Sequence, residues 1–492
     1  MRQAMTAPSP TRHAETAGLG RFERRSALAG LAVLVGAVPF LLLWLLVQRS
    51  WSPLAGLDGD VAAGLNDVVS DSPVLVTALQ VVTDLGGTGT AVFVLVLLTV
   101  VLVVRDHRRL AAFVATTGLG LAVLGPVTKA VVDRARPVVE SPVVATPSNA
   151  SFPSGHSMTA LVTWGVVLLV ALPAVHRRAR RWLIAATVVV VVAVGFTRLA
   201  LGVHFVSDVL AGWALGAGWL AATTASFRAW EHEHHPPAHE PLDPLDVRPD
   251  EAPHAAPGPV PPLPRGRQAG LRLLAVAAAL VATLAGLGLL VTGLLGDSWV
   301  GRLDRAVVEW FVQFRSPTAT AVVDTLGALA GTRTVVLGGL ALGVLGVAVA
   351  ASWRPLVFVA VVLGGEVLLY WATAQLVGRL RPTVADLTQG LPTGASWPSG
   401  HAAAAMALYG AAAALVVVHG RSPRRWWVLT LPLLVAPVVA VSRLYVAAHY
   451  PTDVLAGLVL GGVWVYACTR LLLAAPGRGS RAGVRRRAVA AP

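Results

Sequence analysis

The sequence predicts an all-α membrane protein made of two six-helix bundles in tandem, with about twelve transmembrane helices. Of its 492 residues, 55% are hydrophobic and only 13% are charged, whereas a soluble protein carries about 25% charged residues. Runs such as residues 27–47 contain the roughly 20 apolar residues that cross a bilayer. A set of polar residues also occurs twice with the same spacing, which predicts a duplicated domain.

The predicted spans form two sets of six. In the first half they lie near residues 27–47, 87–104, 110–132, 157–175, 183–197 and 209–226, and in the second half near 273–295, 335–351, 356–376, 402–418, 427–441 and 454–473. The first span follows Arg24 and Arg25, but its apolar run is too long for a signal peptide, so we expect it to be retained.

Polar residues that return at one fixed distance identify the repeat. Each of the following pairs is separated by 245 positions: Arg136 and Arg381, His156 and His401, His204 and His449, Asp208 and Asp453. An even number of spans separates the copies, so both have the same orientation. The predicted domains are a tail (1–26), a first membrane domain (27–228), a linker (229–268), a second membrane domain (269–475) and a basic tail (476–492).

The net charge of +14 comes from loops that alternate with poorly basic ones. Basic clusters lie at residues 105–109, 177–181, 421–425 and 485–487. This is the positive-inside pattern, so it predicts a plasma-membrane protein with cytoplasmic termini and linker, and it does not indicate nucleic-acid binding.

The linker is rich in Pro, His and acidic residues, which predicts a disordered or polyproline-like tether. Metal binding by its histidines is a second interpretation, and the residues are His232, His234, His235 and His239. The single cysteine, Cys468, excludes a disulfide framework and a thiolate metal site.

Charged residues on the outer ends of spans three to six of the first half need a reason, because charge at membrane depth is costly. Lys129, Arg136 and Arg198 lie there with two histidines, and cations that converge on one mouth indicate an anionic ligand. Lys129 is the only lysine among 39 Lys and Arg residues. Its retention in so Arg-rich a chain suggests that a compact ammonium group is required. A chance survivor near a helix end is the alternative.

Lys129 and Arg136 are seven residues apart in "KAVVDRARP". Seven residues are close to two helical turns, so both can face one cavity if the span continues that far before Pro137 ends it.

The stretch "SFPSGHSMTA" (151–160) has the features of a helix start. Ser154 is a suitable N-cap, and Gly155 allows close approach of a ligand to the backbone. The free N–H groups of the first turn can hold an anion, and His156 can exchange a proton with it. Alone, the motif is weak evidence, and an ordinary capped helix followed by a packed histidine is the alternative.

The stretch "TRLALGVHFVSD" (197–208) places His204 and Asp208 four residues apart, hence on one face of a helix. A carboxylate bonded to one imidazole nitrogen frees the other to attack. Arg198 can add a bidentate contact to phosphate. An ordinary helical ion pair is the alternative.

Together the three motifs read Lys-x6-Arg-Pro, Pro-Ser-Gly-His and Arg-x5-His-x3-Asp, and they resemble the signature of the type 2 phosphatidic acid phosphatase superfamily. The resemblance covers both halves, and Thr197 is the one departure in the first, where the family usually has Ser. It implies a metal-independent, cofactor-free phosphomonoesterase or pyrophosphatase. By this resemblance His204 is the nucleophile that forms a phosphohistidine, Asp208 orients it, and His156 is the acid and base. The implied phosphate-binding residues are Lys129, Arg136, Ser154, Gly155 and Arg198.

The second copy keeps most of these residues but not the lysine. It retains Arg381, Ser399, Gly400, His401, Arg443, His449 and Asp453, and it has Ser442 at the position of Thr197. The position of Lys129 is Ala374, and Glu366 stands where the first half has Leu121. A buried Glu is either a functional group or a carboxyl packed against a neighbouring helix. Three interpretations remain: a slower phosphatase, a site with a different substrate preference, or a degenerate half that binds lipid or stabilises a dimer-like pair.

The predicted site opens at the outer leaflet, so the expected substrate is a lipid phosphate, either a polyprenyl pyrophosphate, phosphatidic acid or a similar lipid, and the expected role includes recycling of a cell-wall lipid carrier. Two rival functions are a lipid transporter or flippase, and a phosphotransferase that uses a hydroxyl in place of water. Transporters place polar residues near the midplane, whereas these lie at one face.

Overall fold

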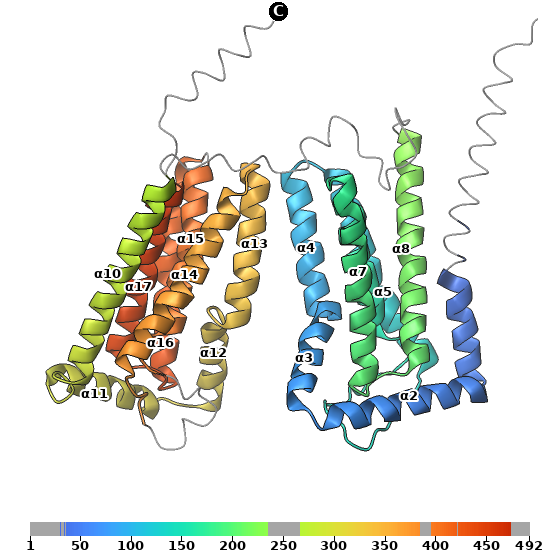
Figure 1. Cartoon of the computed structure of the whole chain (residues 1–492), viewed down its shortest axis with the longest axis horizontal. Coiled ribbons are helices and arrows are strands. Elements are labelled where there is room, and N and C mark those ends of the chain that lie inside the picture. Colours follow the sequence, from blue (N-terminus) through green and yellow to red (C-terminus); the bar gives the residue numbers. More distant parts are fainter. Residues whose placement is uncertain are drawn as a thin grey trace, which may run out of the picture. The chain divides into compact units, whose positions relative to one another are not determined.

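The computed structural model describes residues 30, 34, 36–234, 266–383, 395–420 and 422–473. Its elements are helices joined by short turns and loops (Figure 1). The chain divides into two compact units, residues Met1–Ala256 and Pro257–Pro492, which are described separately. The predicted all-α membrane fold is confirmed.

Unit 1 begins with a helix over Gly36–Gln48. The following helices are α2 (Ser52–Ser70), α3 (Pro73–Thr83), α4 (Thr88–Val104), α5 (Arg108–Val132), α6 (Gly155–Ala171), α7 (Arg177–Ala200) and α8 (Val206–His234), with a 3₁₀ turn, η1 (Asp84–Gly86), between α3 and α4.

Unit 2 repeats this order. Its helices are α10 (Gly266–Thr292), α11 (Trp299–Gln313), α12 (Pro317–Ala328), α13 (Thr332–Ala350), α14 (Arg354–Val377), α15 (Gly400–His419), α16 (Thr430–Tyr445) and α17 (Pro451–Cys468), with a 3₁₀ helix, η2 (Pro423–Leu429), before α16 and a π-helical turn, η3 (Thr469–Leu473), after α17. Most of the predicted linker, residues 235–265, lies outside the described residues, and so do the N-terminal tail, 1–26, and the basic tail, 476–492. Helix α8 continues to His234, and α10 begins at Gly266.

The predicted number of spans is higher than length and composition support. Among the described residues, eight helices are long and apolar enough to cross a membrane, and the number rises to ten if two bent pairs each count as one span. Helix α6 has only 17 residues and is among the shorter apolar helices. Its counterpart α15 has 20 residues and qualifies as a span.

In each unit, a helix that the sequence patterns did not predict follows directly after the first span. Helix α2 turns 90° away from Gly36–Gln48 and runs across the end of unit 1 (Figure 1). Helix α11 occupies the matching place in unit 2. Each carries a buried aspartate, Asp58 or Asp304, both about 1% exposed. These carboxylates become part of the sites described below.

Helix α6 lies at the centre of unit 1 and packs against α8, α7, α5 and α4. The contact with α8 is close at the start of α6, because a Cβ on Gly212 would lie 2.6 Å from the carbonyl oxygen of Ser154. The repeat preserves this contact, since a Cβ on Gly457 would lie 2.3 Å from the Ser399 carbonyl oxygen. Glycine is therefore required where α8 and α17 approach the Ser-Gly-His turns.

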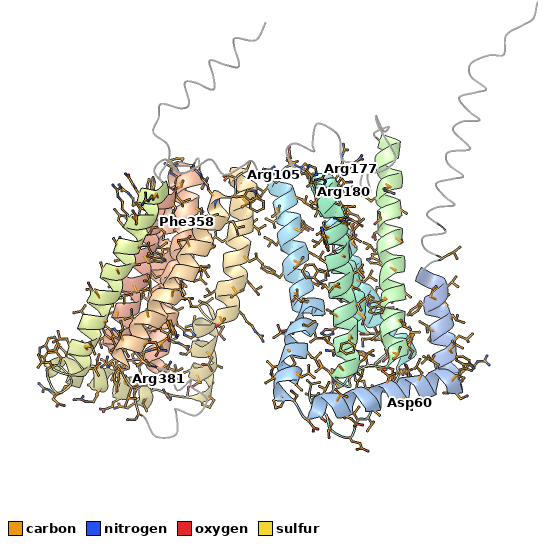
Figure 2. All side chains as sticks on the ribbon, viewed as in Figure 1. Asp60, Arg105, Arg177, Arg180, Phe358 and Arg381 are labelled. Carbon is orange, nitrogen blue, oxygen red and sulfur yellow. The ribbon has the colours of Figure 1, made fainter. Side chains whose placement is uncertain are left out.

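The two ends of unit 1 differ in charge. Arg105, Arg177 and Arg180 lie at one end, and Asp60 of α2 lies at the opposite end (Figure 2). Helices α5 and α7 both begin at the basic end, so Lys129 and Arg198, in their last turns, lie near the other end.

Candidate active site

A cavity of about 990 Å³ lies among helices α4, α5 and α6 of unit 1. Its lining includes six of the eight residues predicted for the first site, namely Lys129, Arg136, Gly155, His156, Arg198 and His204. The other two, Ser154 and Asp208, are completely buried directly behind them. The fold thus brings residues of three segments, up to 75 positions apart, into one pocket.

Lys129 and Arg136 face the same cavity, although the helix does not continue between them as expected. Helix α5 ends at Val132, because Asp133 adopts a left-handed conformation (φ 41°) and its N–H donates to the Lys129 carbonyl. Arg136 therefore lies in the following loop and not on the helix. Both side chains donate to the carbonyl oxygen of Ala150, the lysine through Nζ and the arginine through Nη2. The loop, and not helical periodicity, aligns the two cations.

Ser154 caps α6 as predicted. Its hydroxyl oxygen accepts the N–H of Ser157 at 3.4 Å and the hydroxyl of Ser157 at 2.9 Å. Its own N–H donates to the carbonyl oxygen of Asp208 at 2.9 Å, which ties the start of α6 to α8. Gly155 and His156 follow in the first turn and line the cavity. A helix start with this orientation favours an anion in the cavity.

His204 and Asp208 interact, but not on one helix face. Helix α8 begins at Val206, so His204 lies in the preceding turn, and Asp208 also accepts the N–H of Phe205 at 3.0 Å. Nδ1 of His204 lies 3.3 Å from Oδ2 of Asp208, and Nε2 lies 3.2 Å from Nη1 of Arg136. Burial lowers the pKa of His204 to about 4, outweighing the carboxylate, so the ring is neutral at pH 7. Its Nε2 lone pair is therefore directed at the cationic part of the pocket.

Arg198 is the least satisfied cation of the pocket. It is 7% exposed, its Nη1 donates to the hydroxyl of Thr83 at 3.0 Å, and its buried Nε has no hydrogen-bond partner in the described part of the chain. A buried guanidinium with a spare donor can bind an anion in the cavity.

Asp58 completes a buried network that the motifs did not reveal. Arg134 donates to Asp208 at 2.7 Å, to Ser207 at 2.7 Å and to Asp58 at 2.9 Å. Asp58 also accepts the N–H of Ser207 at 3.0 Å and its hydroxyl. Helix α2 thus holds the carboxylate that orients His204. The only sequence signal is that Asp58 and Asp304 recur at 246 positions, one more than the repeat distance.

The rest of the cavity is apolar and follows two helices away from the cations. It includes Val92, Leu95 and Val100 of α4 and Val114 and Leu119 of α5. Fifteen residues of helix separate Val114 from Lys129, which is about 22 Å. Polar lining at one end and a long apolar groove at the other suit an amphiphilic ligand.

Unit 2 preserves the buried network. Arg379 donates to Asp453 at 2.6 Å, to Thr452 at 2.7 Å and to Asp304 at 2.8 Å, which matches the contacts of Arg134. Arg379 is therefore engaged by two carboxylates and does not replace the absent lysine.

The histidine of unit 2 is held differently. Nδ1 of His449 lies 2.6 Å from the carbonyl oxygen of Ser396 and 3.9 Å from Asp453, whose Oδ2 accepts the Ser396 hydroxyl instead. Burial, together with the nearby charge of Arg381, lowers the pKa of His449 to about 3. A neutral carbonyl fixes the tautomer of the ring, but it stabilises the positive charge of an attacking imidazole less than a carboxylate does.

No group of three or more His, Cys, Asp or Glu side chains within the described residues could hold a metal ion. The linker histidines His235 and His239 lie outside this part of the chain.

Comparison with known proteins agrees with the geometry. The family model of the PAP2 superfamily matches the chain twice, over residues 109–231 and 355–475. These two segments include every residue that the motifs assigned to the two sites.

Two curated proteins are similar to parts of the chain. Phosphatidylglycerophosphatase B of Bacillus subtilis (strain 168) is 43% identical over 96 residues, which is 19% of this chain and 46% of that protein. Undecaprenyl-diphosphatase of Sulfolobus acidocaldarius is 36% identical over 112 residues, which is 22% of this chain and 48% of that protein. The chain thus spans about half the length of the curated relatives it matches.

A crystal structure of a transmembrane PAP2-type phosphatidylglycerolphosphate phosphatase from Bacillus subtilis is 25% identical, with a TM-score of 0.35, and the match covers 38% of this chain and 93% of that one. The two matches of the family model, one in each repeat, identify the chain as a member of the PAP2 superfamily with a tandem duplication.

Proposed function

We propose that unit 1 hydrolyses a lipid phosphate monoester or pyrophosphate without a metal ion, through a phosphohistidine on His204. The supporting observation is the single cavity in which a neutral imidazole, three cations and a long apolar groove meet. A phosphate can lie among the cations while the lipid chain lies between α4 and α5. Both curated relatives are named as phosphatases, and their names give a phospholipid phosphate and a polyprenyl diphosphate as the substrates.

In the proposed first step, Nε2 of His204 attacks phosphorus, and the bond from phosphorus to the lipid oxygen breaks. His156 gives a proton to the departing oxygen. Lys129, Arg136 and Arg198, with the N–H groups at the start of α6, stabilise the negative charge that spreads over the phosphoryl oxygens. Asp208 keeps Nδ1 protonated and stabilises the imidazole as it becomes positively charged.

In the second step, water attacks the phosphohistidine and gives its proton to His156. The phosphorus–nitrogen bond breaks, and inorganic phosphate leaves. A lipid or sugar hydroxyl in place of water would make the same intermediate a phosphotransferase. Release of inorganic phosphate in the absence of an added alcohol distinguishes hydrolysis from transfer.

We propose that the site faces the outside of the plasma membrane, with the termini and linker in the cytoplasm. The support is the distribution of charge in unit 1, where the basic loops lie at one end and the cation-lined part of the cavity lies near the other. The polar lining of the cavity lies at one end of the helices, whereas a transporter places such groups near the midplane. This arrangement favours an enzyme over the flippase alternative.

The proposal predicts that phosphate release from a panel of lipid phosphates survives chelation. Purified protein in detergent is incubated with phosphatidic acid, phosphatidylglycerol phosphate or a polyprenyl pyrophosphate, with and without excess EDTA. Rates should agree within about twofold, because side-chain cations provide the charge that a metal would otherwise supply. Loss of activity with EDTA and its return with a divalent metal would contradict the proposed mechanism.

Asp58 is expected to be a positioning residue for His204. Asp58→Asn keeps the shape of the side chain but removes the charge that holds Arg134 and Ser207. We expect kcat to fall about tenfold, equivalent to about 1.4 kcal/mol, at nearly unchanged KM, because Asp58 does not line the cavity. Asp60→Asn is the matched control, since Asp60 is exposed on the same helix.

A purely structural role for Asp58 predicts a different pattern. In that case Asp58→Asn would lower thermal stability and the amount of folded enzyme, but the folded fraction would keep the wild-type kcat. Active-site titration of the folded fraction separates the two outcomes.

A further inference from the structure

We propose that the second repeat is a binding site for a lipid phosphate diester, which carries one negative charge, and not a second copy of the phosphatase site. This inference rests on the proposed function only in taking the first repeat as the site for doubly charged phosphate. It is carried by three changes in unit 2: a tyrosine ring in place of the lysine, a buried carboxyl in place of a leucine, and an unpartnered serine hydroxyl at the helix start.

The elements of an anion site are present in unit 2. Ser399 precedes α15 as Ser154 precedes α6, and His401 lies in the first turn. Nη1 of Arg381 donates to the carbonyl oxygen of Ala448, the residue before His449, at 3.2 Å, and the charges of Arg381 and Arg443 contribute to the lowered pKa of His449. Arg443 is held by its own neighbour, with Nε donating to the Ser442 hydroxyl at 3.1 Å. Two cations and a helix start therefore remain around the histidine.

Tyr370 takes the place of the lysine side chain. In unit 1, a Cβ added to Gly155 would lie 3.8 Å from Cε of Lys129. In unit 2, a Cβ added to Gly400 would lie 3.2–3.4 Å from three ring atoms of Tyr370, which stands at the position of Gly125. The space beside the Ser-Gly-His turn that holds an ammonium in the first repeat thus holds a neutral phenol in the second.

Glu366 places a buried carboxyl, and no cation, on the same helix face. Glu366, Tyr370 and Ala374 are spaced by four residues on α14, and they stand at the positions of Leu121, Gly125 and Lys129, which all line the cavity of unit 1. Glu366 is 2% exposed, and within the described residues it makes no hydrogen bond or ion pair. A carboxyl at this face provides no positive charge to balance a second negative charge on the ligand.

Ser399 provides a free polar group at the helix start. Its hydroxyl is completely buried and has no hydrogen-bond partner in the described part of the chain. In unit 1 the Ser157 hydroxyl bonds the corresponding Ser154, but the matching residue in unit 2 is Ala402. A buried hydroxyl group is stable only with a hydrogen-bond partner. A phosphate oxygen at the start of α15 can accept a hydrogen bond from the Ser399 hydroxyl.

These changes reduce positive charge more than they reduce the capacity for hydrogen bonding. One cation is lost and a buried carboxyl is gained, whereas the phenol and the serine hydroxyl remain as neutral donors. A phosphate monoester carries between one and two negative charges at pH 7, and a diester carries one. Unit 2 therefore fits the diester better.

The test compares two lipids with identical acyl chains, phosphatidic acid (a monoester) and phosphatidylglycerol (a diester). Binding to the detergent-solubilised full chain is titrated by native mass spectrometry at pH 7.5. The background is Lys129→Ala with His204→Ala, which weakens the first site and prevents turnover. We expect phosphatidylglycerol to bind about tenfold more tightly than phosphatidic acid, a preference worth about 1.4 kcal/mol.

Matched variants locate this preference in unit 2. Adding Tyr370→Gly and Ala374→Lys recreates the Gly125 and Lys129 arrangement and should reverse the order of the two lipids. Adding Arg381→Ala and Arg443→Ala should abolish the preference. If the background does not fold, Tyr370→Gly with Ala374→Lys is made in the wild-type chain, where phosphatidylglycerol affinity should fall about tenfold.

Equal or tighter binding of phosphatidic acid in the background would overturn the proposal, and so would a preference that persists without Arg381 and Arg443. Glycerophosphoglycerol, a soluble diester, should bind much more weakly, and equal affinity would contradict a lipid ligand. The binding measurement needs no turnover. A chain that releases no phosphate in the earlier assay therefore fails the proposed function without affecting this result.

Discussion

His204→Ala is expected to lower phosphate release by a factor of about 10⁴ or more, because it removes the atom that forms the bond to phosphorus. The buried position of His204, between Asp208 and Arg136, leaves no other imidazole nitrogen with the same orientation in unit 1 among the described residues. The measurement compares initial rates of phosphate release from a lipid phosphate substrate by the wild type and by His204→Ala.

His449→Ala is the matched control in the second repeat. Its Nδ1 is bonded to a carbonyl, and the lysine of the first site is absent, so this variant should retain most of the wild-type rate. Circular dichroism and thermal melting check that both variants fold. Equal losses from the two substitutions would mean that the repeats are equivalent enzymes, which contradicts the assignment of catalysis to unit 1.

Lys129→Ala is expected to lower kcat/KM by about 10²–10³, as for the loss of one donor to a developing oxyanion. The Lys129 side chain lines the cavity, and its Nζ donates to the Ala150 carbonyl oxygen. An entering phosphate would replace this carbonyl as the acceptor. Steady-state kinetics in mixed micelles provide the measurement.

Two substitutions at the same position separate charge from shape. Lys129→Met keeps most of the apolar stem and should be as impaired as Lys129→Ala. Lys129→Arg keeps the charge but places a larger planar group beside Gly155, so we expect it to recover only part of the rate. Full activity of Lys129→Arg would show that any cation suffices at this position.

The sequence predicted the helical bundles, and it grouped residues that line one cavity, because both depend on local patterns. Apolar runs mark helices in a membrane, and Ser154 is a standard N-cap whose bond to Ser157 is present. Order and spacing of three motifs were enough to group Lys129, His156 and His204, which all line one cavity.

The contacts between distant segments could not be predicted from the sequence in the same way. The spacing of Lys129 and Arg136 suggested a continuous helix, but Asp133 ends α5 first and the loop aligns the two side chains. His204 and Asp208 suggested one helix face, but the histidine precedes α8. In both cases the residues meet because the tertiary structure of the loops brings them together, which periodicity does not encode.

Asp58 and Tyr370 were missed for a related reason. Asp58 lies on a helix that crosses the end of the bundle, so neither span periodicity nor motif spacing relates it to Arg134. Tyr370 is one of several aromatic residues in a span, and only the packing of its ring on Gly400 distinguishes it. Such residues act through contacts between distant segments, and those contacts need coordinates.

Trapping the phosphorylated enzyme tests the central claim most directly. Full-length protein is mixed with lipid substrate labelled with ³²P in the transferred phosphate, quenched within milliseconds in strong base, and digested for peptide mapping. The account predicts a base-stable, acid-labile label on His204 that is absent in His204→Ala. Label on another residue, or turnover without any labelled protein at every quench time, would contradict it.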